Sequence, residues 1–341
     1  MPRTTPPRPL DVEAEFPELA AHRGLSTRLH PRPGDPGPTE SSVGGPLLWP
    51  ADEPWPVCRT PHRRDRGRRI EDVHEERRVL ARAWLRTTGT GPSDEERETV
   101  TALRRRHRVP GLDDTTPLPL LPLAQLFARD VPGLGAPEGS DLLQVLWCPF
   151  DAHAGHGPGL RLVWRRAADV GALLTEPPRP PVVGSADYVP EPCVLDPEPV
   201  VEHQYQELLG AELCERIEEW EEAAEEAAED DDEADDEADC VTYHHDLSLA
   251  PGWKVGGFAS WSVTGPADLV CSCGAPTRLL LTVAGSEWDR GSLSWVPVED
   301  RERIDTYDAN VPTRVVVGRG GSLNVFVCTA DPTHEHRVSL Q

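Results

Sequence analysis

Apolar residues gather along the chain in short runs. Two of these runs, Leu118 to Leu126 and Leu279 to Val283, have the length of a strand. Two more, Leu143 to Cys148 and Leu323 to Cys328, each end in a cysteine. Short apolar runs bounded by turn residues are typical of strands that are covered on both faces. They predict an α+β fold that is mainly β, with these strands in its core.

The same order of features occurs twice. A Val-Gly-Gly tripeptide at 43–45 precedes Trp49 at the same spacing as the one at 255–257 precedes Trp261. A cysteine, an apolar run and a second run that ends in cysteine follow in each copy. An aspartate and then a histidine come soon after each closing cysteine. This agreement predicts an internal duplication in which two half-domains pack face to face.

The Gly-Gly pairs lack the features of a phosphate-binding loop. Neither pair is followed by Gly-Lys-Ser/Thr or by the third glycine of a dinucleotide-binding fingerprint. Glycine reaches positive φ angles without strain and is common where a strand bends. We therefore expect each pair to form a bend next to a strand that packs against the following tryptophan.

Helical spacing appears between the predicted strands. Ile70 to Arg86 places apolar residues at helical intervals, and Ser93 opens a capping box for a second helix. We expect these two helices to form a hairpin inserted into the first copy. Val201 to Trp220 also carries its apolar residues on one helical face and predicts a helix that docks on the core.

The N-terminal segment is rich in proline and glycine, and only Val12 to Arg23 has a helical pattern. Such a composition favours a flexible arm. The predicted organisation is a flexible arm at 1–40, a first half-domain at 41–165 with an Arg-rich helical insert at 59–110, a Pro-rich linker, helix and acidic tract at 166–249, and a second half-domain at 250–341.

Negative charge is concentrated in one segment. The formal net charge is -25, and residues 215–239 contain 16 Asp or Glu against one Arg. Like charges repel, and the segment lacks an apolar face beyond Trp220, so we expect an acidic disordered loop from Glu229. A negative chain repels phosphate backbones, which argues against general nucleic-acid binding and favours a basic partner.

The remaining composition bears on location. Eight cysteines over 341 residues are too sparse for a small disulfide scaffold, so reduced thiols or metal ligands are expected. No apolar run has the length of a membrane span, and prolines occupy the N-terminus where a secretory signal needs apolar residues. These features predict a cytoplasmic protein without a membrane partner, and they leave its oligomeric state open.

Thiol and imidazole groups gather in the second copy. Cys271, Cys273 and Cys328, with His334 or His336, offer the soft ligands of a tetrahedral zinc site. The alternative is that these cysteines are simply buried at strand ends. Zinc is therefore the one cofactor that the sequence suggests, with Cys271, Cys273, Cys328 and His334 as its ligands.

The first copy repeats this arrangement with one cysteine fewer, in Cys58, His62, Cys148 and His153. A catalytic Cys/His pair would be Cys148 with His153, or Cys240 with His244. Neither pair has a helix N-terminus or an orienting third residue in the sequence pattern. We therefore expect no catalytic residues.

The duplicated pattern resembles the YwqG-like family, a bacterial domain of unknown function. Its second half is also similar to the programmed-cell-death-protein-two family. The resemblance covers 41–153 and 250–341, and it implies a β-rich fold and a protein-binding role, since the eukaryotic relatives are chaperones of a ribosomal protein. Some bacterial members lie near toxin systems as immunity proteins. The matching residues of the second copy are Val255 to Gly257, Trp261, Cys271 to Gly274, Leu279 to Val283 and Leu323 to Cys328.

The function expected from the sequence is a non-catalytic protein-binding module, chaperone-like or inhibitory toward a basic protein client. One alternative is an RNA-associated protein that uses the Arg-rich insert. That insert carries no interleaved aromatic residues for base stacking, which favours a solvated surface. The other alternative is a zinc-dependent enzyme of unknown substrate.

Overall fold

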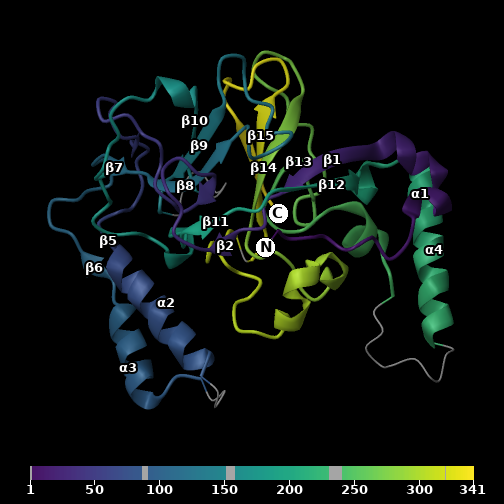
Figure 1. Cartoon of the computed structure of the whole chain (residues 1–341), viewed down its shortest axis with the longest axis horizontal. Coiled ribbons are helices and arrows are strands. Elements are labelled where there is room, and N and C mark those ends of the chain that lie inside the picture. Colours follow the sequence, from purple (N-terminus) through teal and green to yellow (C-terminus); the bar gives the residue numbers. More distant parts are fainter. Residues whose placement is uncertain (1, 87–90, 151–157, 230–239, 319) are drawn as a thin grey trace.

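Two six-stranded sheets form the centre of the protein (Figure 1). The structure is a computed structural model that describes residues 2–86, 91–150, 158–229, 240–318 and 320–341. In spatial order, the first sheet consists of β10 (Leu160–Arg165), β9 (Leu142–Trp147), β8 (Leu121–Phe127), β3 (Ser42–Val43), β11 (Cys193–Val194) and β2 (Arg32–Pro33). The second consists of β12 (Glu198–His203), β1 (Arg23–Arg28), β13 (Lys254–Gly256), β14 (Thr277–Ala284), β15 (Ser322–Cys328) and β16 (Arg337–Leu340).

The predicted core strands are confirmed as β8, β9, β14 and β15, which are almost completely buried. The order β3-β8-β9-β10 in the first sheet matches β13-β14-β15-β16 in the second, and all neighbours are antiparallel. The second and third strands of each set also share a register shift, near Pro122 and near Leu279. One hydrophobic core contains side chains of both sheets, including Val145 and Trp147 of β9 and Leu281 and Val325 of β14 and β15.

The predicted helical hairpin is confirmed. Helix α2 (Ile70–Trp84) packs against α3 (Asp94–Leu103). Ser93 and Glu96 form the capping box at the start of α3, each side chain bonding to the backbone N–H of the other residue. The short ladder of β5 (Arg66–Gly67) with β6 (His107–Arg108) closes the base of the hairpin, and β4 (Val57–Cys58) pairs with β7 (Leu118–Pro119) nearby.

The fold is mixed, because helices and strands contribute similar numbers of described residues, so the expectation of a mainly β protein is not confirmed. Much of the helix lies in short turns within the connections, where sequence periodicity is too brief to detect. Outside the hairpin, the α-helices are α1 (Val12–Glu15) and α4 (Ala211–Glu229). The short helical turns are η1 (Pro17–His22), η2 (Ala167–Asp169), η3 (Ala186–Tyr188), η4 (Gln206–Leu208), the π-helical η5 (Tyr243–Ser248), η6 (Leu293–Trp295) and η7 (Val298–Arg303).

The N-terminal segment, predicted as a flexible arm at 1–40, instead contributes β1 to the interior of the second sheet, between β12 and β13. Its Ser26, Thr27 and Arg28 are buried although they are polar. A strand of this composition carries no apolar alternation and therefore cannot be recognised from its pattern of apolar residues. The segment also contributes β2 to the first sheet, so the predicted boundary at residue 41 does not separate an arm from the folded protein.

The predicted helix from Val201 to Trp220 is wrong in its first part. Val201 lies in β12, which pairs with β1 over six residues, and the helix α4 starts only at Ala211. The tertiary pairing overrides the helical spacing of the apolar residues. Helix α4 extends to Glu229, and residues 230–239 of the predicted acidic disordered loop lie outside the described residues. No helix in the described part of the chain is both long and apolar enough for a bilayer crossing.

A buried ion pair fixes the first strands of the second sheet. The Lys254 Nζ lies 2.6 Å from Glu202 Oε1, and the two side chains are 4% and 0% exposed. The Glu202 carboxylate also accepts hydrogen bonds from the backbone N–H groups of Ala250 and Phe258, each at 3.0 Å. A side chain at Gly257 would place its Cβ 2.2 Å from Glu202 Oε2, and the φ of Gly257 is +69°. The bend expected at this Gly-Gly pair is thus confirmed. Glycine is required at position 257 because a Cβ there would collide with the Glu202 carboxylate.

We expect Lys254→Met to lower the free energy of unfolding by about 3–5 kcal/mol, because it leaves the Glu202 carboxylate buried without a cation. Urea unfolding followed by fluorescence measures the change. The control is Arg337→Met, which breaks a partly exposed pair with Glu335 and should cost less than about 1 kcal/mol. Equal effects of the two substitutions would contradict a central role for the buried pair.

Candidate metal centre

Four side chains at one end of the second sheet, three of them from connections, converge in the arrangement of a metal site. The ligand atoms of Cys271, Cys273, Cys328 and His334 all lie within 4.8 Å of one another. The Cys271 Sγ is 3.5 Å from His334 Nδ1, and the Cys273 Sγ is 3.5 Å from Cys328 Sγ. Tetrahedral zinc, with bonds of about 2.3 Å to sulfur and about 2.0 Å to nitrogen, requires S···N and S···S separations of about 3.5 and 3.8 Å. The cluster therefore has dimensions that fit zinc.

A tight turn before β14 explains the close Cys-x-Cys spacing. The N–H of Gly274 donates to the carbonyl of Cys271, and the N–H of Cys271 donates to the carbonyl of Ala275, both at 2.9 Å. Gly274 adopts a φ of +87°, which a residue with a Cβ rarely reaches. The turn brings both thiols to the end of β15, where Cys328 is the last residue.

The histidine ligand comes from the connection between β15 and β16. The N–H of His334 donates to the Asp331 carbonyl at 3.1 Å, and the His334 Nε2 lies 3.7 Å from Asp331 Oδ2. Nδ1 thus faces the cluster while the other ring nitrogen faces a carboxylate, which is how metal-bound histidines are usually oriented. Of the two predicted alternatives, the structure places His334 in the cluster and not His336.

Backbone amides stabilise the thiolate form of Cys271 and Cys328, whereas the thiols of Cys328 and Cys271 raise the pKa of Cys273. The N–H of Cys273, and then the neighbouring thiols and His334, lower the pKa of Cys271 to about 6. The N–H groups of Asp331 and Ala330 lower the pKa of Cys328. The thiols of Cys328 and Cys271 raise the pKa of His334. Donors aimed at sulfur favour the deprotonated state that a metal ion requires.

A second, smaller cluster lies where β9 of the first sheet ends. The Sγ atoms of Cys58 and Cys148 each lie 3.3 Å from His62 Nε2. Cys58 ends β4 and Cys148 directly follows β9. All three side chains are buried. His153, the fourth residue expected here, lies outside the described residues.

The Cys/His pairs considered for catalysis are not supported. Cys148 faces His62, and its proposed partner His153 is outside the described residues. The Cys240 thiol faces the carbonyl of Ala224 at 3.7 Å. The ring of His244 packs instead against those of Tyr205 and His245. The described residues therefore do not join Cys240 with His244 as a nucleophile and its base.

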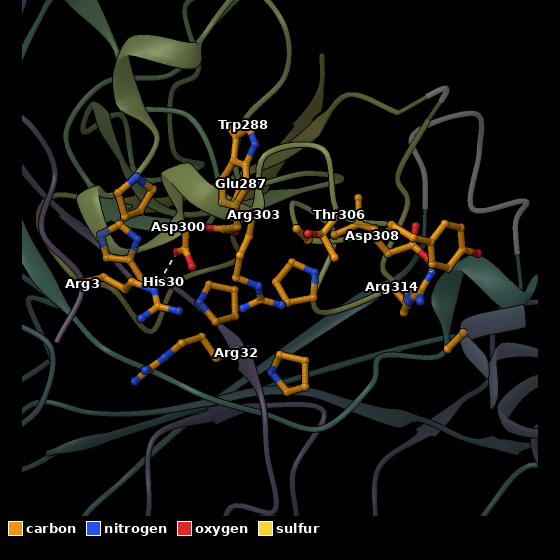
Figure 2. A pocket seen from close by; sticks show the side chains of 18 of the residues that line it. Arg3, His30, Arg32, Glu287, Trp288, Asp300, Arg303, Thr306, Asp308 and Arg314 are labelled. Carbon is orange, nitrogen blue, oxygen red and sulfur yellow. Dashed lines mark ion pairs between the residues drawn. The ribbon is translucent and has the colours of Figure 1, made fainter. Parts of the chain in front are cut away.

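Sequence reasoning missed a pocket of about 560 Å³ between the N-terminal segment, α2 and the chain from 287 to 314. Figure 2 shows Arg3 facing Asp300 on one side and Arg314 beside Asp308 on the other. Burial raises the pKa of Glu287, which also lines the pocket, to about 7. Most of these charges pair with each other, and the described lining contains neither cysteine nor serine. Its residues come from distant segments and form no motif that a sequence pattern could reveal.

Comparison with known proteins adds no relative. No protein-family model matches the chain, and a search of curated proteins finds no similar sequence. The likeness to the YwqG-like family stays a prediction that rests on the repeated glycines, tryptophans and cysteines.

We expect tag-free protein to lose one equivalent of zinc when Cys271 is replaced by serine, as measured by plasma mass spectrometry. The variant should also lose about 3 kcal/mol of unfolding free energy when free zinc is at about 100 times its Kd. The matched control is Cys214→Ser, because that half-buried thiol donates to the carbonyls of Gln206 and Leu209 and belongs to neither thiol cluster. Unchanged zinc content in Cys271→Ser would rule out this centre.

Proposed function

We propose that the protein is a non-catalytic binding module for a basic protein client, chaperone-like or inhibitory, with a structural zinc ion at the Cys271 cluster. The observation that carries the proposal is the composition of α4, which has nine glutamates and one arginine. This helix lies at one end of the long axis of the molecule, opposite the α2-α3 hairpin (Figure 1). It presents a dense negative surface to a partner.

The acidic surface is ordered because α4 docks by its apolar face. Leu213 and Ile217 are buried in a cluster with Phe16, Leu19 and Tyr243. The N–H of Tyr243 also donates to the Glu221 carboxylate at 2.6 Å. The glutamates left exposed on the described part of the helix are Glu212, Glu215, Glu218, Glu219, Glu222, Glu225 and Glu226.

The one cation of α4 does not neutralise this surface. Arg216 pairs with Glu18 of η1 at 2.6 Å and lies over the ring of Phe16. Its guanidinium thus pairs with a carboxylate of the N-terminal segment and not with the glutamates of α4. The exposed glutamates create a potential that accelerates encounter with a positive partner and weakens as salt is added. The acidic tract that follows would extend the same potential.

The zinc centre supports a structural role. Four protein ligands fill a tetrahedral sphere, whereas catalytic zinc keeps one position for water or substrate. The cysteines of the described chain form no disulfide, as a reducing cytoplasm would keep them. We further infer an internal duplication, supported by the matching strand orders, the matching register shifts and the cysteine at the end of each third strand.

The RNA alternative is weakened by how the insert uses its arginines. Arg64 is fully buried, and its guanidinium binds backbone carbonyls. Arg68 and Arg104 both pair with Glu76 of α2. Cations held by carboxylates and carbonyls contribute little to binding of a phosphate backbone.

We expect Glu218, Glu222 and Glu225 replaced together by glutamine to weaken binding of a fluorescent Arg-rich peptide about tenfold at low salt, since each exposed charge contributes roughly 0.5 kcal/mol. Fluorescence anisotropy measures the affinity. The matched control replaces Glu71, Glu95 and Glu98 of the hairpin by glutamine, and should bind the peptide as the native protein does. Equal losses in both variants would point to net charge alone and contradict an α4 site.

A heparin column tests the RNA alternative. We expect the protein to pass through without retention at low salt, because its net charge of -25 repels a polyanion. Retention with a steep dependence of elution on salt would favour nucleic acid as the partner.

A further inference from the structure

The three buried residues Cys58, His62 and Cys148 meet around one point. Their ligand atoms lie within 4.8 Å of one another, and Nε2 of His62 is at the same distance, 3.3 Å, from both sulfurs. The Nε2 atom of His62 carries either one proton or one lone pair. A hydrogen bond therefore accounts well for its contact with one of the two sulfurs but not with both. A metal ion between the three atoms accounts for both.

The backbone that carries two of these residues is fixed from within. The guanidinium of Arg64, which is fully buried, donates to the carbonyl of Cys58 at 3.2 Å and to that of His62 at 3.3 Å. It also donates to the carbonyls of Thr60 and Thr116. The loop from 58 to 64 is thus wrapped around a buried cation that holds it in one conformation. A site built in this way is ready for a ligand before the ligand arrives.

The cluster occupies the same place in its sheet as the Cys271 cluster does in the other. Cys148 directly follows β9, the third strand of β3-β8-β9-β10, and Cys328 ends β15, the third strand of β13-β14-β15-β16. The other cysteines of both clusters come from the connection between the first and second strands of these sets. Each sheet therefore brings thiols together at the end of its third strand.

We propose that Cys58, His62 and Cys148 hold a second zinc ion, buried in the first sheet. Two thiolates and a neutral imidazole balance the charge of Zn²⁺ and have the softness that it prefers. These three donors leave one position of the tetrahedron for a further ligand. Burial distinguishes the two centres, since Cys58, His62 and Cys148 are 6%, 7% and 0% exposed, whereas the His334 side chain is 40% exposed.

The proposal is tested by the zinc content of tag-free protein. We expect two equivalents in the native chain, one in Cys148→Ser, one in Cys271→Ser and none in the double variant. Cys193→Ser is the matched control, because Cys193 is an equally buried strand thiol that contacts the carbonyl of Pro312. A native content of one equivalent that only Cys271→Ser removes would overturn the second centre and leave the first intact.

A second measurement does not depend on how the Cys148 variant folds. A zinc-binding dye added to the native protein should extract the exposed ion in a fast phase. The buried ion should follow only when denaturant is added, because its ligands open only when the first sheet does. Release of all zinc in one fast phase, or an absent denaturant-dependent phase, would overturn the proposal.

Discussion

The pairing of Lys254 with Glu202 is the constraint on which the second sheet depends. Glu202 belongs to β12 and Lys254 to β13, and β1 runs between these strands. A buried carboxylate is costly unless a cation and hydrogen bonds surround it, and here backbone N–H groups complete the set. The same interaction therefore fixes strand β1 and the glycine bend after β13. It also fixes the edge of the second sheet from which β14 and β15 lead to the Cys271 cluster.

The buried charges extend beyond this pair. Arg28 of β1 is also fully buried and donates to the carbonyl of Trp295 at 2.9 Å and to the hydroxyl of Thr5 at 2.8 Å. Residues far apart in the sequence thereby meet around one strand. Hydrogen bonds of this kind favour one arrangement of the strands, because another arrangement would lose these partners of the buried guanidinium.

Sequence patterns were informative where the cause of the structure is local. The capping box at Ser93 and the apolar runs of β9 and β15 depend on neighbours in the chain, and both were predicted. The convergence of Cys271, Cys273, Cys328 and His334 was predicted as well, because thiols follow a repeated pattern of strand ends in the sequence. Strand β1 could not be predicted, since its Arg28 is stabilised by residues far away in sequence. The apolar residues near Val201 predicted a helix wrongly, because pairing with the distant strand β1 decides their conformation.

Lys254 is the sole lysine of the chain, and it is enclosed within the second sheet. In the folded protein no ε-amino group is therefore available to acylating reagents or to enzymes that attach modifiers to lysine. The side chain becomes reactive only when β12 and β13 separate. Acylation of Lys254 would consequently report how often the sheet opens, as a mass increment on the one peptide that contains this lysine.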